Sequence, residues 1–259
     1  MRARRLLHLV ARRGNCAEFP DNTLPAVRSA IELGARFIEI DVHLSADGVP
    51  MIAHDRQLAV VPGVEQMSAT QLAALDVSQA ERFGERFRGT RLASLAATLG
   101  LLDRRPEVTA FVMIGRVSVA RFGHELVAAQ VTQALKPFRS RCVLASMDLP
   151  TLHAARAMAG YPIAWVVPAN DAHTRLKYEA LQPEFLFCDR AYLPAQGALW
   201  RGPWRWVIYE VDSLDAVLEV GAAGADFVVT RNFRRLSAAM HTHAAQDAQP
   251  SSDGLSSSC

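Results

Sequence analysis

Short apolar segments alternate with amphipathic segments along most of this chain, and this alternation constrains the fold more than any other feature. The apolar runs have the length of buried strands, and most are followed by a stretch with apolar residues at helical spacing. The expected strands cover residues 6–11, 37–42, 111–114, 142–146, 163–167, 185–188, 206–211 and 227–230. A strand followed by a helix, repeated about eight times, favours a parallel (β/α)₈ TIM barrel. A doubly wound open sheet is the alternative, although it normally uses fewer units.

The expected helices and the domain limits complete this prediction. Helices are expected at residues 22–33, 68–75, 120–135, 149–158, 172–181, 214–222 and 234–240. After the turn at Asp47-Gly48, residues 49–53 return as a further strand, and the pattern then weakens over residues 56–102. We interpret this stretch as a small insertion after the second strand of a single barrel domain, residues 1–240. Residues 241–259 are polar and serine-rich, and we expect a disordered tail there.

Composition excludes several classes of protein. Half of the 259 residues are hydrophobic, which suits a folded core, and the net charge of +2 gives no reason to expect a nucleic-acid partner. The sequence contains no apolar run of ~18 residues, so no membrane span is expected. The basic start is followed by an apolar run that is too short for a secretory leader, and the four cysteines are far apart. These features predict a cytoplasmic protein with free thiols.

Two carboxylates stand out at the end of the second expected strand. Functional groups of a TIM barrel lie at the carboxyl ends of its strands. Glu39 and Asp41 are two residues apart, so both side chains point to the same face of the strand. Such oxygen ligands suit Mg²⁺ or Ca²⁺. From the spacing alone, a salt-bridge cluster with Arg12 or Arg13 remains the alternative.

Other strand ends carry further candidates. His54 follows the return strand and precedes Asp55, and a histidine near carboxylates can act as a general acid or base near neutral pH. Arg13 follows the first strand and can bind a phosphate or carboxylate with two hydrogen bonds.

In order and spacing, these residues resemble the amino-terminal signature of the glycerophosphodiester phosphodiesterase family. That signature runs HRG, PENT, an ExD strand, a D-G turn and an HD pair. The corresponding residues here are Arg12-Arg13-Gly14, Pro20-Asp21-Asn22-Thr23, Glu39-Ile40-Asp41, Asp47-Gly48 and His54-Asp55. Residues 221–230 also resemble the last-strand segment of the family. The resemblance extends from residue 7 to about residue 237 and implies the same barrel with a small insertion.

The resemblance implies an activity and a set of site residues. Members of the family hydrolyse glycerophosphodiesters to glycerol 3-phosphate and an alcohol. A divalent cation sits on the ExD carboxylates and on a glutamate of the third strand, two histidines act as acid and base, and an arginine and a lysine hold the phosphate. Carried over, this implies metal ligands at Glu39 and Asp41, a catalytic histidine at His54, and a phosphate-binding, catalytic arginine at Arg13.

Three positions depart from the family pattern. Arg12 replaces the HRG histidine, and the third-strand motif FVEIK reads Phe111-Val112-Met113-Ile114-Gly115, so that Met113 and Gly115 replace the metal-binding glutamate and the lysine. Arginine stays protonated and cannot act as a base, a thioether is a poor ligand for a hard cation, and glycine has no charge. We therefore expect weak or lost hydrolysis.

Three functions remain open at this point. The first is hydrolysis of a glycerophosphodiester, with Mg²⁺ or Ca²⁺ as cofactor if the site is competent and with none otherwise. The second is a non-catalytic barrel that binds a phosphodiester or another anion, with Arg12 and Arg13 as substrate-binding residues, or that serves as a scaffold. The third is an enzyme of another class that reuses His54, Glu39 and Asp41.

Overall fold

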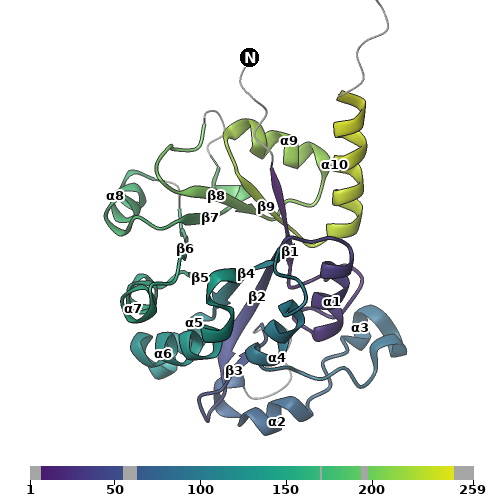
Figure 1. The fold of residues 1–259 in the computed structure, drawn as a ribbon, viewed down its shortest axis with the longest axis vertical. Coiled ribbons are helices and arrows are strands. Elements are labelled where there is room, and N and C mark those ends of the chain that lie inside the picture. Colours follow the sequence, from purple (N-terminus) through teal and green to yellow (C-terminus); the bar gives the residue numbers. More distant parts are fainter. Residues whose placement is uncertain (1–6, 55–62, 170, 194–197, 248–259) are drawn as a thin grey trace, which may run out of the picture.

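Eight parallel strands close into a barrel in the computed structural model, which describes residues 7–54, 63–169, 171–193 and 198–247 (Figure 1). The ring is closed because β1 pairs with both β2 and β9, and every strand of the ring is parallel to its neighbours. The strands, in the order of the ring, are β1 (His8–Arg12), β2 (Phe37–Leu44), β4 (Thr109–Ile114), β5 (Cys142–Ser146), β6 (Ile163–Val166), β7 (Phe185–Asp189), β8 (Arg205–Tyr209) and β9 (Phe227–Thr230). The predicted (β/α)₈ barrel is thus confirmed.

Aromatic side chains fill the interior of the barrel. The Phe111 ring lies 5.1 Å from that of Phe185 and 5.2 Å from that of Phe187, and Phe227 lies 5.7 Å from Phe185. Alternate residues of each strand point outward and pack against the helices. Because the interior is packed solid, polar chemistry is confined to the ends of the barrel.

Helices cover the outside of the barrel, and several begin at a side-chain cap that the sequence provides. Thr23, Asp148 and Ser213 each accept a hydrogen bond from a backbone N–H of the first turn that follows. The covering helices are α1 (Leu24–Glu32), α5 (Arg116–Phe122), α6 (His124–Leu135), α7 (Leu149–Ala159), α8 (Ala172–Leu181), α9 (Leu214–Ala223) and α10 (Phe233–Asp247).

The insertion after the second strand is built from short elements. β3 (Pro50–Ile52) pairs antiparallel with the end of β2, and the chain then forms α2 (Ala69–Ala74), α3 (Ala80–Phe83) and α4 (Leu95–Leu99) before it enters β4. In Figure 1, α2 lies at the bottom of the view and α3 at the lower right, near α1. A small apolar cluster around Met51, Leu72 and Leu92 holds this unit to the barrel. Residues 55–62, with part of the predicted insertion, lie outside the described residues.

Two predicted helix limits are wrong. The single helix expected at residues 120–135 is two helices, α5 and α6, because Gly123 adopts φ of +82° and breaks the backbone between them. The tail expected from residue 241 is wrong for residues 241–247, which continue α10. Alanines favour helix there, and no proline interrupts the chain before Pro250. Residues 248–259 lie outside the described part of the chain.

No helix in the described ranges is both long enough and apolar enough to cross a membrane.

Candidate functional site

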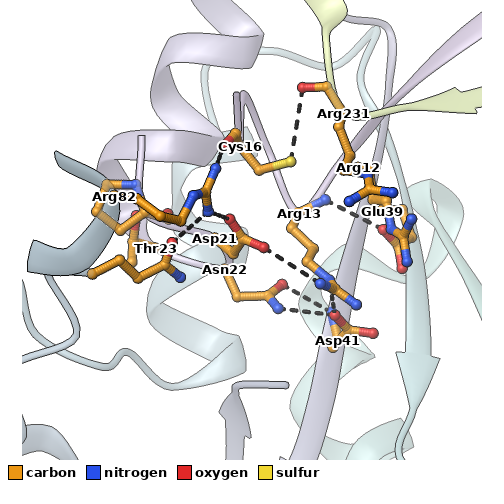
Figure 2. Close-up of polar contacts among 12 residues, drawn as sticks. Arg12, Arg13, Cys16, Asp21, Asn22, Thr23, Glu39, Asp41, Arg82 and Arg231 are labelled. Atoms are coloured by element: carbon orange, nitrogen blue, oxygen red, sulfur yellow. Dashed lines mark hydrogen bonds and ion pairs between the residues drawn. The ribbon is translucent and has the colours of Figure 1, made fainter. Parts of the chain in front are cut away.

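Arg13 gathers three carboxylates at the carboxyl end of the barrel, which we call the mouth. Its Nε donates to Oδ2 of Asp41 at 2.6 Å, and its Nη1 lies 3.3 Å from Oδ2 of Asp21 (Figure 2). Its backbone N–H donates to Oε2 of Glu39 at 3.3 Å. Glu39 and Asp41 are buried, at 5% and 7% exposure. The structure therefore pairs the two predicted carboxylates with an arginine.

The turn after β1 presents Arg13 at this place. Arg13 has φ of +51° and Gly14 has φ of +79°, so the chain reverses within two residues. A Cβ atom at Gly14 would lie 2.4 Å from the carbonyl carbon of Ala26 in α1, so only glycine fits against this helix. A non-glycine residue at positive φ is uncommon and stores backbone strain, which the surrounding contacts of Arg13 offset.

Asn22 fixes the second carboxylate from the other side. Its Nδ2 donates to Oδ2 of Asp41 at 2.9 Å, and its Oδ1 accepts the backbone N–H of Asp41 at 3.1 Å. Asn22 also has positive φ, +53°, a conformation that asparagine tolerates better than most residues. Asn22 belongs to the segment that resembles PENT, but no pattern in the sequence indicates that its side chain holds Asp41.

Arg82 reaches the mouth from α3 of the insertion. Its Nη1 lies 2.5 Å from Oδ1 of Asp21, and its Nη2 lies 2.6 Å from the carbonyl oxygen of Cys16 (Figure 2). No local pattern in the sequence indicates this contact, because the insertion brings it from 61 residues away.

Glu210 holds Arg12 on the opposite side of the mouth. Oε1 of Glu210 accepts from Nη1 of Arg12, and Oε2 lies 2.5 Å from Nη2 of Arg231. Glu210 directly follows β8 at φ of +60°, so the strand ends earlier than the predicted residue 211. We refer to the connected set as the mouth network, and its members are Arg12, Arg13, Asp21, Asn22, Glu39, Asp41, Arg82, Glu210 and Arg231.

Burial and charge determine the protonation of this network. Burial, followed by the neighbouring charge of Asp41, raises the pKa of Glu39 to about 7 despite the opposing effects of Arg13 and Arg12. For Glu210, burial acts in the opposite direction, but the hydrogen bond and charge of Arg12 and the pairing with Arg231 leave its pKa below the ordinary value. Burial lowers the pKa of the Arg13 guanidinium, but the charges of Asp41 and Glu39 raise it by more, so that the pKa lies above its ordinary value. Arg12 and Arg13 therefore both carry permanent charge.

The third strand of the ring offers no carboxylate to this cluster. Met113 is paired with Asp41 in the register of β2 and β4, is only partly buried, and packs against the interior aromatic side chains. No group of three or more His, Cys, Asp or Glu side chains suited to a metal ion occurs in the described ranges. Asp41 already accepts two side-chain hydrogen bonds on Oδ2, so the donor set fits a hard divalent cation poorly.

His54 follows β3 beside this cluster. The backbone N–H of Ala53 donates to the carbonyl oxygen of Asp41 at 3.1 Å, which places the half-buried His54 next along the chain. Its neighbour Asp55 lies outside the described residues. The structure thus brings Arg12, Arg13, Glu39 and Asp41 into one network and places His54 at its edge.

His8, which shares the strand face of Arg12, stays away from the mouth. Its ring lies 5.3 Å from that of Phe37 and 5.0 Å from that of Phe227, within the aromatic interior of the barrel. It cannot replace the histidine that is missing at position 12.

Trp200, Trp204 and Trp206 lie at the other end of the molecule. They line a cavity of about 1180 Å³ together with His8 and Asp226, which mark the amino ends of β1 and β9. These three tryptophans therefore take no part in the mouth. The indole N–H groups of Trp204 and Trp206 both donate to the carbonyl oxygen of Trp200, so the three residues pack a loop.

The fold and site define a TIM barrel with arginines and carboxylates at its mouth, and comparisons with known proteins give its family. The model of the glycerophosphoryl diester phosphodiesterase family matches residues 13–230, and the chain belongs to this family. A glycerophosphodiester phosphodiesterase of Caldanaerobacter subterraneus is 28% identical over 158 residues, which are 58% of this chain and 62% of that protein. The human glycerophosphoinositol inositolphosphodiesterase is 36% identical over 98 residues, 38% of this chain and 17% of its own length. These matches span less than two thirds of either relative.

Solved structures of similar fold cover nearly the whole chain. A phosphodiesterase of Oleispira antarctica in complex with sn-glycerol-3-phosphate superposes with a TM-score of 0.78 at 18% identity, covering 91% of this chain and 97% of that one. A glycerophosphodiester phosphodiesterase of Parabacteroides distasonis gives a TM-score of 0.79 at 17% identity, covering 93% and 100%. At these identities the likeness supports the fold alone.

Proposed function

We propose that the mouth binds the phosphate group of a glycerophosphodiester, or of a related phosphate-containing ligand, through Arg12 and Arg13, and that hydrolysis is slow or lost. The observation that carries this proposal is that Arg13 pairs with Asp41 and Glu39, the carboxylates expected to hold a cation. The neighbour from Oleispira antarctica was solved with sn-glycerol-3-phosphate, which supports a ligand of this class.

Anion binding needs only what the chain provides. Two guanidinium groups on adjacent residues offer donors in fixed planar arrays that match phosphate oxygens. Asp41 and Glu210 orient Arg13 and Arg12 respectively, so little side-chain entropy is lost when a ligand binds. A bound phosphate would lose its hydrating water molecules and gain hydrogen bonds from these donors, together with the attraction of the positively charged guanidinium groups.

Hydrolysis needs more than the chain offers. One group must activate water, and another must protonate the departing alkoxide. His54 can supply one of these roles, whereas Arg12 stays protonated and can supply neither efficiently. Loss of one partner costs a factor of about 10²–10⁴ in rate. The family relationship favours the alternative of an ordinary hydrolase, and the replaced residues favour binding without efficient turnover.

The compartment is part of the same proposal. Cys16, Cys142 and Cys188 are buried free thiols in the structure, and burial raises the pKa of each to about 12. Unpaired cysteines are usual in a reducing compartment, which supports the cytoplasm as the location.

The experiment combines turnover with binding. Glycerol 3-phosphate release is measured from a panel of glycerophosphodiesters with Mg²⁺, with Ca²⁺ and with chelator, and phosphate and glycerol 3-phosphate binding is measured by calorimetry. We expect little turnover under any condition, and binding that is unchanged by chelator but at least tenfold weaker in Arg12→Gln. The exposed Arg28→Gln in α1 is the matched control. Rapid, cation-dependent turnover by the unmodified protein would overturn the proposal.

A further inference from the structure

Position 115 is glycine because of a neighbouring side chain rather than because of its backbone. Gly115 has φ of −67° and ψ of 134°, which any residue can adopt. A Cβ atom built at Gly115 would lie 2.3 Å from Cε1 and 2.4 Å from Nε2 of His43. The imidazole of His43 therefore fills the volume that the first atoms of a side chain at position 115 require.

Hydrogen bonds hold His43 in this place. Its Nδ1 lies 2.7 Å from Oε1 of Glu65, and the Ser118 hydroxyl donates to the same oxygen at 2.6 Å. The Ser118 hydroxyl oxygen also accepts the backbone N–H of Leu44 at 2.9 Å, which ties the cluster to β2. His43 and Glu65 are each 2% exposed, and Ser118 is fully buried. If the imidazole moved aside, it would leave a buried carboxylate with one partner fewer, which is costly.

The two residues stand at the mouth, one level above the carboxylates. His43 follows Asp41 by two positions on β2, and Gly115 follows Met113 by two positions. The backbone N–H of Gly115 donates to the Val42 carbonyl oxygen at 2.9 Å, which continues the pairing of β2 with β4. Side chains two apart on a strand share a face. The clash thus concerns the edge of the mouth where the family resemblance implies a phosphate-binding lysine.

We propose that His43 is the residue that keeps position 115 without a side chain, so that Gly115 and the His43–Glu65–Ser118 cluster form one coupled unit. The unit leaves this edge of the mouth without a positively charged side chain, so that phosphate binding falls to Arg12 and Arg13 at the end of β1. It also means that a lysine placed at position 115 cannot enter the mouth while His43 keeps its contacts. The assignment of phosphate binding to Arg12 and Arg13 rests on the proposed function, whereas the steric coupling does not.

A thermodynamic cycle tests the coupling without any reference to function. Gly115→Ala is made in the wild type and in a His43→Asn background, where the shorter side chain removes Cε1 and Nε2, the two atoms nearest to position 115, and still carries a donor for Glu65. We expect Gly115→Ala to lower the Tm by roughly 4–10 °C in the wild type and by less than half as much in the background. If the single background variant does not fold, His43→Ala combined with Glu65→Gln replaces it, because the carboxylate charge is then removed as well.

Gly100→Ala is the matched control for this cycle. Gly100 has φ of −57° and ψ of −23°, and no other heavy atom lies within 4 Å of a Cβ built there. The control should leave the Tm unchanged or slightly raised in both proteins. The proposal would be overturned if Gly115→Ala left the Tm of the otherwise wild-type protein unchanged, or if it lowered the Tm equally in both backgrounds.

A binding measurement tests the functional consequence. Gly115→Lys is made in the wild type and in the His43→Asn variant, and the binding of inorganic phosphate to each protein is measured by calorimetry at fixed ionic strength. Gly100→Lys is the control for the added charge. We expect about a tenfold gain in phosphate affinity only where His43 has been replaced. Equal gains with and without His43 would overturn the proposal. If the Tm cycle shows the coupling but Gly115→Lys raises the phosphate affinity in neither protein, the steric role of His43 is supported and the anion site at this edge is contradicted.

Discussion

Met113 lies beside Asp41 in the parallel pairing of β2 with β4, on the face of the sheet that also carries Glu39. A thioether thus occupies the position at which the family resemblance implies a third carboxylate. Asp41 is buried in an ion pair with Arg13, and Glu39 is buried with a hydrogen bond from the backbone N–H of Arg13, so both carboxylates face an arginine where Met113 adds no charge.

Met113→Glu should convert the mouth toward a cation site. Three carboxylates at neighbouring positions repel one another unless a cation neutralises them, so the variant should be less stable than the wild type in chelator. We expect added Ca²⁺ to restore its Tm and to bind at least tenfold more tightly than to the wild type by calorimetry. Met147→Glu, at a side chain that is 41% exposed, is the control and should show neither effect. A variant that is indifferent to Ca²⁺ would contradict this role of position 113.

Glu210→Gln should increase the affinity of the mouth for phosphate. Glu210 pairs with Arg12 and Arg231, so it competes with an incoming anion for both guanidinium groups. Removing its charge should strengthen phosphate binding by about three- to tenfold. Glu219→Gln on α9, which removes an exposed pair with Arg190 on the outside of the barrel, is the matched control. Weaker binding by Glu210→Gln would mean that Glu210 orients Arg12 more than it competes for it.

Arg13→Ala should be strongly destabilising. It leaves Asp41 and Glu39 buried without their principal cation, and removal of one partner of a buried pair costs about 3–5 kcal/mol. Urea unfolding measures this loss directly. Arg175→Ala, which removes an exposed pair with Glu179 in α8, should cost no more than about 0.5 kcal/mol. Similar losses in the two variants would show that Arg13 contributes little to the folded state.

The stability of the protein should fall as the pH rises toward neutrality, because of Glu39. Its pKa is about 7 in the folded state against an ordinary value of 4.5, so the folded protein retains a proton that the unfolded chain has lost. The resulting stabilisation is complete below about pH 4.5 and is lost as the pH rises through 7. Glu39→Gln should flatten this part of the profile in urea unfolding between pH 5 and pH 8. Glu125→Gln, at an exposed residue of α6, should leave the profile unchanged.

The barrel fold and some of the residues at its mouth could be predicted from the sequence for physical reasons. Strands buried on both faces are continuous apolar runs, and capped amphipathic helices between them leave few other topologies. Arg13, Glu39 and Asp41 could be named because they stand near the carboxyl ends of the first two expected strands, which a closed barrel brings together.

The remaining contacts depend on structure that no local pattern encodes. Glu210 could face the mouth or the helices until the end of β8 was known, and Arg82 arrives from an insertion without periodicity. His43 lies just beyond the strand expected at residues 37–42, and no local pattern marks it, because its importance lies in its distance from Gly115, 72 positions further along the chain. The break at Gly123 was missed because apolar spacing continues across it.

Charges within the mouth network nearly cancel. Arg12, Arg13, Arg82 and Arg231 face Asp21, Glu39, Asp41 and Glu210, so little electric field extends from the mouth into solvent. A charged ligand is therefore not drawn in from a distance, and it meets attraction only after it has displaced a carboxylate at close range. The association rate should thus be that of an unsteered encounter, and salt should affect it far less than in an open basic cleft.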